Sequence, residues 1–261
     1  MADDVLLIET SDRITTLTMN RPEARNALSF ELRSAMTAAF RKFSDDAGTG
    51  VIILTGTPPA FCAGLDLKEL GGETAGRNAG ADPMAPTQNF DLVKAMEACA
   101  APIIGAINGV AVTGGFEVAL GCDVLIASTE GRFADTHARV GIMPGWGLSQ
   151  KLSRLIGVSR AKEMSLTGNF IAATQAAAWG LVNRVVEPEE LLPACRALAS
   201  DMLSCVPDVM RNYKHVIDEG YAQTYAVGRA IETVANRENR VSSEQIAERR
   251  QAIQQRGRQQ Q

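Results

Sequence analysis

The stretch GVAVTGGFEVALGCD (109–123) places one carboxylate among small and apolar residues. Burying a carboxylate costs free energy unless it has partners, so Glu117 needs a chemical or a structural reason. Gly114 lies three positions earlier, and residues three apart share one face of a helix. A ligand carbonyl held by the Gly114 N–H would therefore lie beside a carboxylate that can move a proton. The same pattern also fits a helix packed closely on a sheet through its glycines, with Glu117 in an ion pair.

A second glycine turn, in PPAFCAGLDLKEL (58–70), offers another backbone donor. Ala63 and Gly64 follow an apolar strand end, so this segment could be no more than a strand-to-helix turn. If it faces Gly114, the Leu65 N–H becomes the second donor of an oxyanion hole, and each donor is worth roughly 3–4 kcal/mol in other enzymes. Such a hole suits chemistry in which a thioester carbonyl becomes an enolate.

These turns need a scaffold of strands and helices that brings them together. The runs VLLIET and RITTLTMN, separated by SD, predict a β-hairpin. The run GVIILTG (50–56) predicts a strand that is buried on both faces. Further strands are expected over 102–109 and 123–128, and helices over 21–46, 87–100, 114–121 and 145–157. Strands that alternate with helices indicate an α/β fold, and the chain beyond residue 190 reads as nearly all helical.

Five segments in the same order resemble the crotonase superfamily, the enoyl-CoA hydratase/isomerase family. They are MNRPEARNAL (19–28), FCAGLDLKEL (61–70), INGVAVTGGFEVALGCD (107–123), RFADTHARVGIMPGWGLSQKLSRLIG (132–157) and AAAWGLVNRVV (176–186). The resemblance runs from about Val5 to about residue 250. It implies a crotonase-like ββα superhelix as the core domain over 1–195. It also implies a C-terminal helical trimerisation region over 196–261, often in a dimer of trimers (a hexamer), and we expect that region to end in a disordered polar tail.

The resemblance also implies a ligand and a reaction. The ligand is a coenzyme A thioester whose carbonyl lies between the Leu65 and Gly114 N–H groups. Glu117 matches the first catalytic glutamate of the hydratases, which handles the water that adds to a trans-2-enoyl-CoA to give a 3-hydroxyacyl-CoA in fatty acid metabolism. No metal and no resident cofactor are implied, because coenzyme A is part of the substrate.

One position departs from the hydratase pattern. The second glutamate is expected twenty residues after the first, and this chain has His137 there. Histidine transfers protons near neutral pH, so Glu117 and His137 together could run the addition. His137 could equally be a hydrogen-bonded wall of the pocket. Asp135 is close in sequence, but side chains two apart in an extended segment share a face and need not both reach the site.

Several further residues are candidates for substrate binding. Arg25 and Lys68 match basic positions that contact coenzyme A phosphates in the family, although both could be solvated charges. Phe61, Trp146 and the glycine-rich stretch 70–86 are expected to shape the acyl pocket, the last as a lid or binding loop. The candidate substrate-binding residues are Arg25, Ala63, Asp66, Leu67, Lys68 and Trp146.

Composition restricts the partners and the compartment. A net charge of −4 argues against nucleic acid or an anionic membrane as the main partner. Five cysteines without a CxxC motif indicate reduced thiols in a cytoplasmic protein. No signal peptide and no membrane-spanning run are expected. The chain has only two histidines, His137 and His215, so no histidine-rich metal cluster can form.

Fold alone does not decide the reaction, so three functions stay open. The first is the enoyl-CoA hydratase. The second is another crotonase-type conversion run by Glu117 alone, such as double-bond isomerisation or thioester hydrolysis. The third is an acyl-CoA-binding protein without turnover, suggested by the missing second glutamate.

Overall fold

The computed structural model describes residues 4–70 and 91–259. The lid or binding loop predicted over 70–86 lies, apart from Leu70, outside the described residues. Contacts divide the chain into two units, Met1–Cys205 and Val206–Gln261. The first unit therefore extends past residue 195, where the sequence suggested that the core domain ends.

The larger sheet of the first unit has six strands in the order β1-β2-β3-β5-β7-β10. β1 and β2 form the predicted antiparallel hairpin, and the other neighbours pair in parallel. The strands predicted over 50–56, 102–109 and 123–128 are confirmed as β3, β5 and β7. The bounds are β1 Leu6–Ser11, β2 Ile14–Met19, β3 Val51–Gly56, β5 Ile103–Ile107, β7 Val124–Ser128 and β10 Arg184–Val186.

A smaller sheet has the order β4-β6-β8-β9. Its strands are β4 Ala60–Cys62, β6 Val110–Val112, β8 Arg132–Ala134 and β9 Ile171–Ala172. A long strand of the larger sheet leads into a short strand of the smaller one three times: β3 into β4, β5 into β6, and β7 into β8. A helix follows each pair, so the ββα unit recurs along the chain.

Helices cover both sheets. The first unit contains η1 Pro22–Ala24, α1 Phe30–Ser44, α2 Leu67–Leu70, α3 Leu92–Glu97, α4 Gly114–Leu120, α5 His137–Val140, α6 Leu148–Ile156, α7 Val158–Thr167, α8 Ala173–Ala178, η2 Pro188–Glu190 and α9 Leu191–Leu203. The helix predicted over 21–46 begins only at Phe30. Arg25 and Asn26 have φ values of 50° and 55°, which an α-helix does not allow. The Ser29 hydroxyl then accepts a hydrogen bond from the Leu32 N–H and caps α1.

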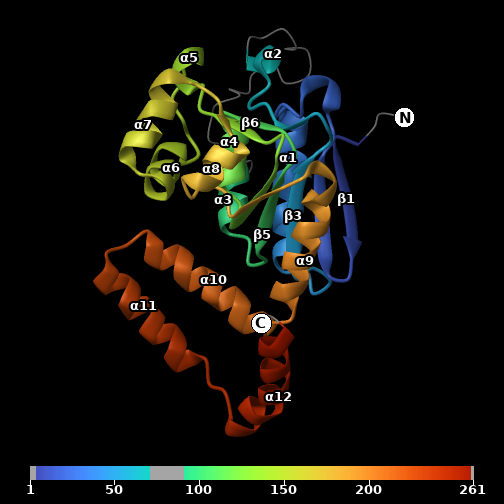
Figure 1. Ribbon diagram of the computed structural model, residues 1–261, viewed down its shortest axis with the longest axis vertical. Coiled ribbons are helices and arrows are strands. Elements are labelled where there is room, and N and C mark those ends of the chain that lie inside the picture. Colours follow the sequence, from blue (N-terminus) through green and yellow to red (C-terminus); the bar gives the residue numbers. More distant parts are fainter. Residues whose placement is uncertain (1–3, 71–90, 260–261) are drawn as a thin grey trace. The chain divides into compact units, whose positions relative to one another are not determined.

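β3 is buried on both faces, as the run 50–56 predicted. Successive side chains of a strand point to opposite faces, so Ile52 and Leu54 join the main core while Val51 and Ile53 join a second cluster. The second cluster is completed by Leu191, Cys195 and Ala199 of α9, which lies alongside β3 and β5 (Figure 1). α5, α6 and α7 form a group beside α4 in the same figure.

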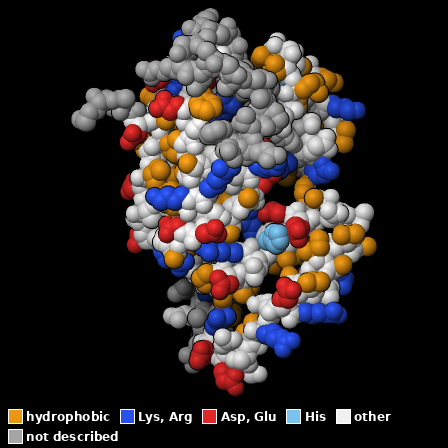
Figure 2. Space-filling model, turned by 180° about the vertical axis from the view of Figure 1, so that it is seen from behind, with side chains coloured by type: hydrophobic (Ala, Val, Ile, Leu, Met, Phe, Trp, Pro, Cys, Tyr) orange, Lys and Arg blue, Asp and Glu red, His pale blue; other side chains and the backbone are white. Residues whose placement is uncertain are grey.

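The second unit is helical. α10 (Pro207–Tyr221) and α11 (Tyr225–Glu238) pack as a hairpin, and α12 spans Ser243–Gln259. The expected disordered tail is a helix through Gln259, because the Gln, Glu, Ala and Arg residues of α12 all favour helix. Large hydrophobic side chains are exposed on α10 and α11 (Figure 2): Tyr213, Ile217, Tyr221, Tyr225, Val227 and Val234. No helix in the described part of the chain is long and apolar enough to cross a membrane.

Candidate active site

Three turns meet at one edge of the smaller sheet. β6 pairs in parallel with both β4 and β8, so the carboxyl ends of these three strands lie side by side. Leu65 follows β4, Gly114 follows β6, and His137 follows β8. The ββα repeat therefore brings together residues that lie up to 72 positions apart in the chain.

The two predicted N–H donors belong to turns that lie close together. A Cβ placed on Gly114 would lie 3.5 Å from the Leu65 nitrogen, and one placed on Gly64 would lie 3.4 Å from the Gly114 nitrogen. Among the described residues, none accepts a hydrogen bond from either N–H. Gly64 has φ of 94°, a value that favours glycine, and the chain turns here next to Leu65.

Backbone bonds hold the Gly64 turn in place. Leu28 N–H donates to the Gly64 carbonyl at 2.8 Å, and Asp66 N–H donates to the Leu28 carbonyl at 3.4 Å. Arg21 reaches the same turn through an ion pair with Asp66, with 2.9 Å between Nη2 and Oδ2. The loop before α1 thus fixes the position of the Leu65 N–H.

The other turn is held at Thr113, directly before α4. Thr113 has φ of 54°, which is unfavourable for a β-branched residue and points to a position fixed by its surroundings. Its N–H donates to the Ala134 carbonyl at 3.0 Å, and its hydroxyl bonds the hydroxyl of Thr136. A Cβ on Gly115 would lie 2.2 Å from the Cys62 carbonyl oxygen. Gly115 therefore packs α4 on β4, while Gly114 faces the Leu65 turn.

Glu117 is 3% exposed and is held at both carboxylate oxygens. Oε1 accepts a hydrogen bond from the Trp146 backbone N–H at 2.8 Å. Oε2 lies 3.5 Å from Nε2 of His137. Within the described residues His137 is the only basic side chain at ion-pair distance from Glu117. This carboxylate is consequently oriented by the backbone, with one oxygen turned to the imidazole.

His137 is 4% exposed and is the first residue of α5. Nδ1 lies 2.7 Å from Oδ1 of Asp135 on the side of the ring away from Glu117. Burial disfavours the charged ring, but the hydrogen bonds and negative charges of Asp135 and Glu117 outweigh this and raise the pKa of His137 to about 9. His137 thus lies between two acidic side chains that favour its charged, imidazolium form.

Asp135 meets His137 because the chain is not extended here. β8 ends at Ala134 and α5 begins at His137, so the chain turns between the two side chains. Burial would raise the pKa of Asp135, but hydrogen bonds from His137 and from the Ser165 side chain lower it below its ordinary value. Its carboxylate is therefore the ionised partner of the imidazolium.

The remaining candidates differ in their surroundings. The side chains of Arg25, Leu67 and Lys68 are exposed, whereas Ala63 is half-buried and its N–H donates to the Arg25 carbonyl at 3.0 Å. Asp66 accepts from the Lys68 N–H at 3.1 Å in addition to its Arg21 pair, so both carboxylate oxygens have partners. Trp146 lies against Gly114, since its Cζ3 would be 3.5 Å from a Cβ there.

Sequence reasoning missed Arg21, Ser165 and the Trp146 N–H. Arg21 belongs to the quoted segment MNRPEARNAL, but nothing in its spacing links it to Asp66. Ser165 has no local signal because it reaches Asp135 from α7. A backbone donor such as the Trp146 N–H has no side-chain pattern at all.

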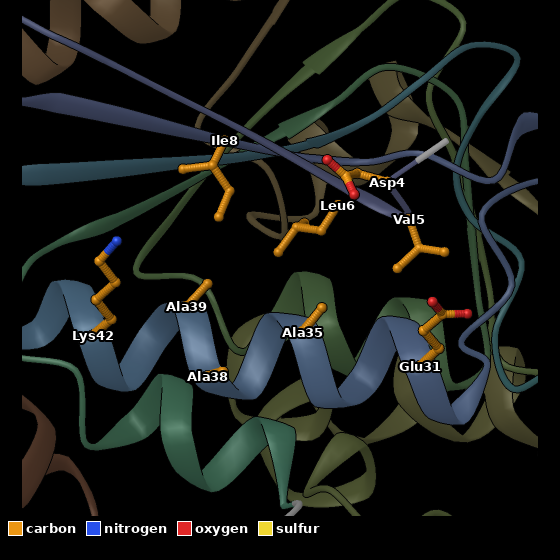
Figure 3. Close-up of a pocket in the computed structure, with 9 residues that line it drawn as sticks. All are labelled: Asp4, Val5, Leu6, Ile8, Glu31, Ala35, Ala38, Ala39 and Lys42. Carbon is orange, nitrogen blue, oxygen red and sulfur yellow. The ribbon is translucent and has the colours of Figure 1, made fainter. Parts of the chain in front are cut away.

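A surface groove of about 390 Å³ lies elsewhere, between β1 and α1 (Figure 3). It is lined by Asp4, Val5, Leu6, Ile8, Glu31, Ala35, Ala38, Ala39 and Lys42. None of the predicted site residues lines this groove. In the described part of the chain, no group of three His, Cys, Asp or Glu side chains is placed to hold a metal ion.

Comparisons with known proteins show the family of the chain. Residues 9–258 match the family model described as enoyl-CoA hydratase/isomerase. A probable peroxisomal enoyl-CoA hydratase of Arabidopsis thaliana is 42% identical over 210 residues, which cover 80% of this chain and 77% of that protein.

Solved structures resemble the fold throughout. An enoyl-CoA hydratase of Mycobacterium tuberculosis is 45% identical, with a TM-score of 0.73 over 90% of this chain and 97% of that one. An enoyl-CoA hydratase of Bacillus anthracis is 31% identical, with a TM-score of 0.83 over 97% and 96% of the two chains. The crotonase-like α/β fold expected from the sequence is confirmed.

Proposed function

Because the chain belongs to the enoyl-CoA hydratase/isomerase family, we propose that it adds water to a trans-2-enoyl-CoA thioester and forms a 3-hydroxyacyl-CoA. One observation supports this reaction above the others. A buried carboxylate and a buried imidazolium face each other beside two backbone N–H groups that have no acceptor among the described residues. Relatives that are 42% and 45% identical to this chain over the aligned residues are named enoyl-CoA hydratases.

The N–H groups of Leu65 and Gly114 bind the thioester oxygen. When water attacks C3, the electrons of the double bond move toward this oxygen and it gains negative charge. Donors that are already in place stabilise such a charge without reorganisation, and losing one costs about 10²–10³ in rate in comparable enzymes. Gly64 and the bonds of its turn keep the Leu65 donor in position.

Glu117 is the base. The Trp146 N–H occupies Oε1, so Oε2 is the atom that takes the proton from water. His137 is the acid, because its Nε2 is protonated at neutral pH and faces the same space. One water oxygen can lie within hydrogen-bond distance of both atoms, since they are 3.5 Å apart. Base and acid so placed add H and OH across one double bond.

The substrate itself supplies coenzyme A, and we propose no resident cofactor or metal. Arg25 and Lys68 are exposed and basic, and they are our candidates for its phosphates. Ala63, Asp66, Leu67 and Trp146 belong to the turns around the thioester and are proposed to contact the substrate or to shape its pocket.

We also propose that the chain forms a trimer or a dimer of trimers. Exposed Tyr213, Ile217, Tyr221 and Tyr225 on α10 and α11 form the kind of apolar surface that subunit contacts cover. All five cysteines are free thiols, which supports a reducing compartment such as the cytoplasm. The Arabidopsis relative is named peroxisomal, so fractionation of cells that produce this protein tests the location.

The reaction is tested with crotonyl-CoA and a longer trans-2-enoyl-CoA. We expect loss of the conjugated thioester absorbance and a product heavier by the mass of one water. A product of unchanged mass with a shifted double bond would replace hydration by isomerisation, and free coenzyme A would replace it by hydrolysis. If calorimetry shows binding but neither ester is converted, the chain is an acyl-CoA-binding protein without turnover.

A further inference from the structure

The site holds a third ionisable side chain that the proposed reaction does not use. Asp135 is 2% exposed, and its Oδ1 accepts bonds from two groups of His137: the ring Nδ1 at 2.7 Å and the backbone N–H at 3.2 Å. The Ser165 side chain of α7 supplies another hydrogen bond. A buried carboxylate with this set of partners is fixed in place.

This contact fixes the imidazole in turn. A carboxylate on Nδ1 requires that Nδ1 carries a hydrogen, because an ionised carboxylate only accepts. The ring plane is then set, and Nε2 is left facing Oε2 of Glu117 at 3.5 Å. The three side chains form a row in which the histidine is central and each carboxylate lies at a different ring nitrogen.

Polar and charged groups approach His137 from α4, α7, its own helix α5 and the turn between β8 and α5. Glu117 faces it from α4, and Asp135 faces it from the turn between β8 and α5. From α7, the Ser165 hydroxyl reaches Asp135 rather than the ring. Arg139, two residues further along α5, is directed to the Thr167 carbonyl at 2.6 Å. Among the described residues, both ionisable groups paired with the ring are thus carboxylates, and both favour its charged form.

We propose that Asp135 is a positioning residue that holds His137 as a doubly protonated imidazolium with Nε2–H directed at the reacting carbon, so that Glu117 is always the base and His137 always the acid. The assignment of acid and base rests on the proposed hydration. The stabilisation of the charged form of His137 by Asp135 does not depend on which reaction the site catalyses.

The proton balance explains why the charge matters. Oε2 of Glu117 takes a proton from water, the water oxygen bonds C3, and the double-bond electrons move to the thioester oxygen. The electrons return, and C2 takes the proton of His137 Nε2. Glu117 is now protonated and His137 neutral. Transfer from Oε2 to Nε2 restores both, and one water has been added overall. The negative charge of Asp135 drives this last transfer because it stabilises the imidazolium.

The titration of His137 tests the positioning role without any assay of activity. The chain has two histidines, so His215→Asn leaves a single imidazole to observe by NMR in the full chain labelled with ¹³C-histidine. We expect its midpoint well above the ordinary value of about 6.5. Asp135→Asn in this background keeps the shape and removes the charge, and we expect the midpoint to fall by about one unit or more.

Asp12→Asn is the matched control. Asp12 is an exposed carboxylate in the β1–β2 turn with φ of 52°, a conformation that asparagine adopts equally well. This variant should leave the midpoint of His137 unchanged. Equal midpoints in the Asp135→Asn and parent proteins would overturn the proposal. If Asp135→Asn does not fold, a parent midpoint at or below about 6.5 would overturn it as well.

Kinetics separate this proposal from the proposed reaction. With crotonyl-CoA, Asp135→Asn should move the high-pH decline of kcat toward neutral pH by about one unit or more. If Asp135 serves only packing, the substitution will lower kcat equally at every pH, and that result would contradict the proposal. A shifted NMR midpoint in a protein that hydrates no enoyl-CoA would support the positioning role and refute the hydratase. Hydration with an unshifted midpoint would support the hydratase and refute the positioning role of Asp135.

Discussion

Substitution by alanine should have different consequences at the two neighbouring glycines that begin α4: a loss of activity at Gly114 and a loss of stability at Gly115. At Gly114, an added Cβ would lie 3.5 Å from the Leu65 nitrogen and 3.5 Å from Cζ3 of Trp146, both ordinary contact distances. Gly114 also has no positive φ, so alanine fits its backbone. We expect Gly114→Ala to fold, with a free energy of unfolding that is unchanged or raised by about 0.5–1 kcal/mol because alanine favours helix.

The effect of Gly114→Ala on turnover is expected to be large. An oxyanion donor lies about 2.7–3.1 Å from the oxygen that it stabilises. A methyl carbon 3.5 Å from the Leu65 nitrogen would compete with that oxygen for the space beside this donor. Since the oxygen would then lose its hydrogen bond from the Leu65 N–H, kcat/KM should fall by about 10²–10³.

Gly115→Ala is the matched control. Its Cβ would lie 2.2 Å from the Cys62 carbonyl oxygen and 2.8 Å from the carbonyl carbon, and backbone atoms inside a sheet cannot move aside. We expect the free energy of unfolding to fall by about 1–3 kcal/mol or more.

Urea unfolding and the hydration rate with crotonyl-CoA measure both variants. A Gly114→Ala protein that hydrates within about threefold of the parent rate would refute the oxyanion hole, for which loss of one donor costs about 10²–10³. A Gly115→Ala protein as stable as the parent would refute the close packing of α4 on β4.

Three further predictions concern charged side chains. First, the pKa of His137 is raised from its ordinary 6.5 to about 9, so its stabilising effect is complete below pH 6.5 and is lost as the pH rises through 9. Urea unfolding at a series of pH values should show a loss of up to about 3 kcal/mol that His137→Gln removes, and an equal loss in that variant would contradict this. Second, Arg21→Met leaves the Asp66 carboxylate without its ion-pair partner, so the free energy of unfolding should fall by about 1–3 kcal/mol. Adding Asp66→Asn to this variant should restore part of the lost free energy of unfolding. If the losses of the two single variants simply add in the double variant, the two side chains are not coupled. Third, Lys68→Ala should weaken binding of crotonyl-CoA about two- to fivefold by calorimetry and leave crotonyl-pantetheine unchanged, because only the former carries the nucleotide phosphates. Equally weakened binding of both esters would mean that Lys68 does not contact the nucleotide phosphates.

The long elements of the fold could be predicted because their signals are local. The hairpin, the three apolar strands and the helix that contains Gly114 and Glu117 each follow from a pattern within one segment. The strands β6 and β8 were missed, and β4 was recognised only as an apolar strand end before Ala63, because three residues are too few to show a period. These short strands are the ones that bring Leu65, Gly114 and His137 to one edge.

Residues of the site could be predicted from the sequence only where the residue type itself was unusual for its segment. Glu117 and His137 stand out as polar residues in apolar or family-like segments. The bond between Asp135 and His137 depends on the chain turning at residue 137 instead of continuing extended. The Trp146 N–H that orients Glu117 is a backbone group, and only the folded chain shows where it points.

The most direct measurement compares turnover and binding for Glu117→Gln. Glutamine keeps the size of the side chain and an acceptor for the Trp146 N–H, but it cannot take a proton from water. Our account predicts that hydration of crotonyl-CoA falls by about 10²–10⁴ while calorimetry shows unchanged binding of the ester. Hydration by Glu117→Gln at close to the parent rate would contradict it, because the base would then have to be another group.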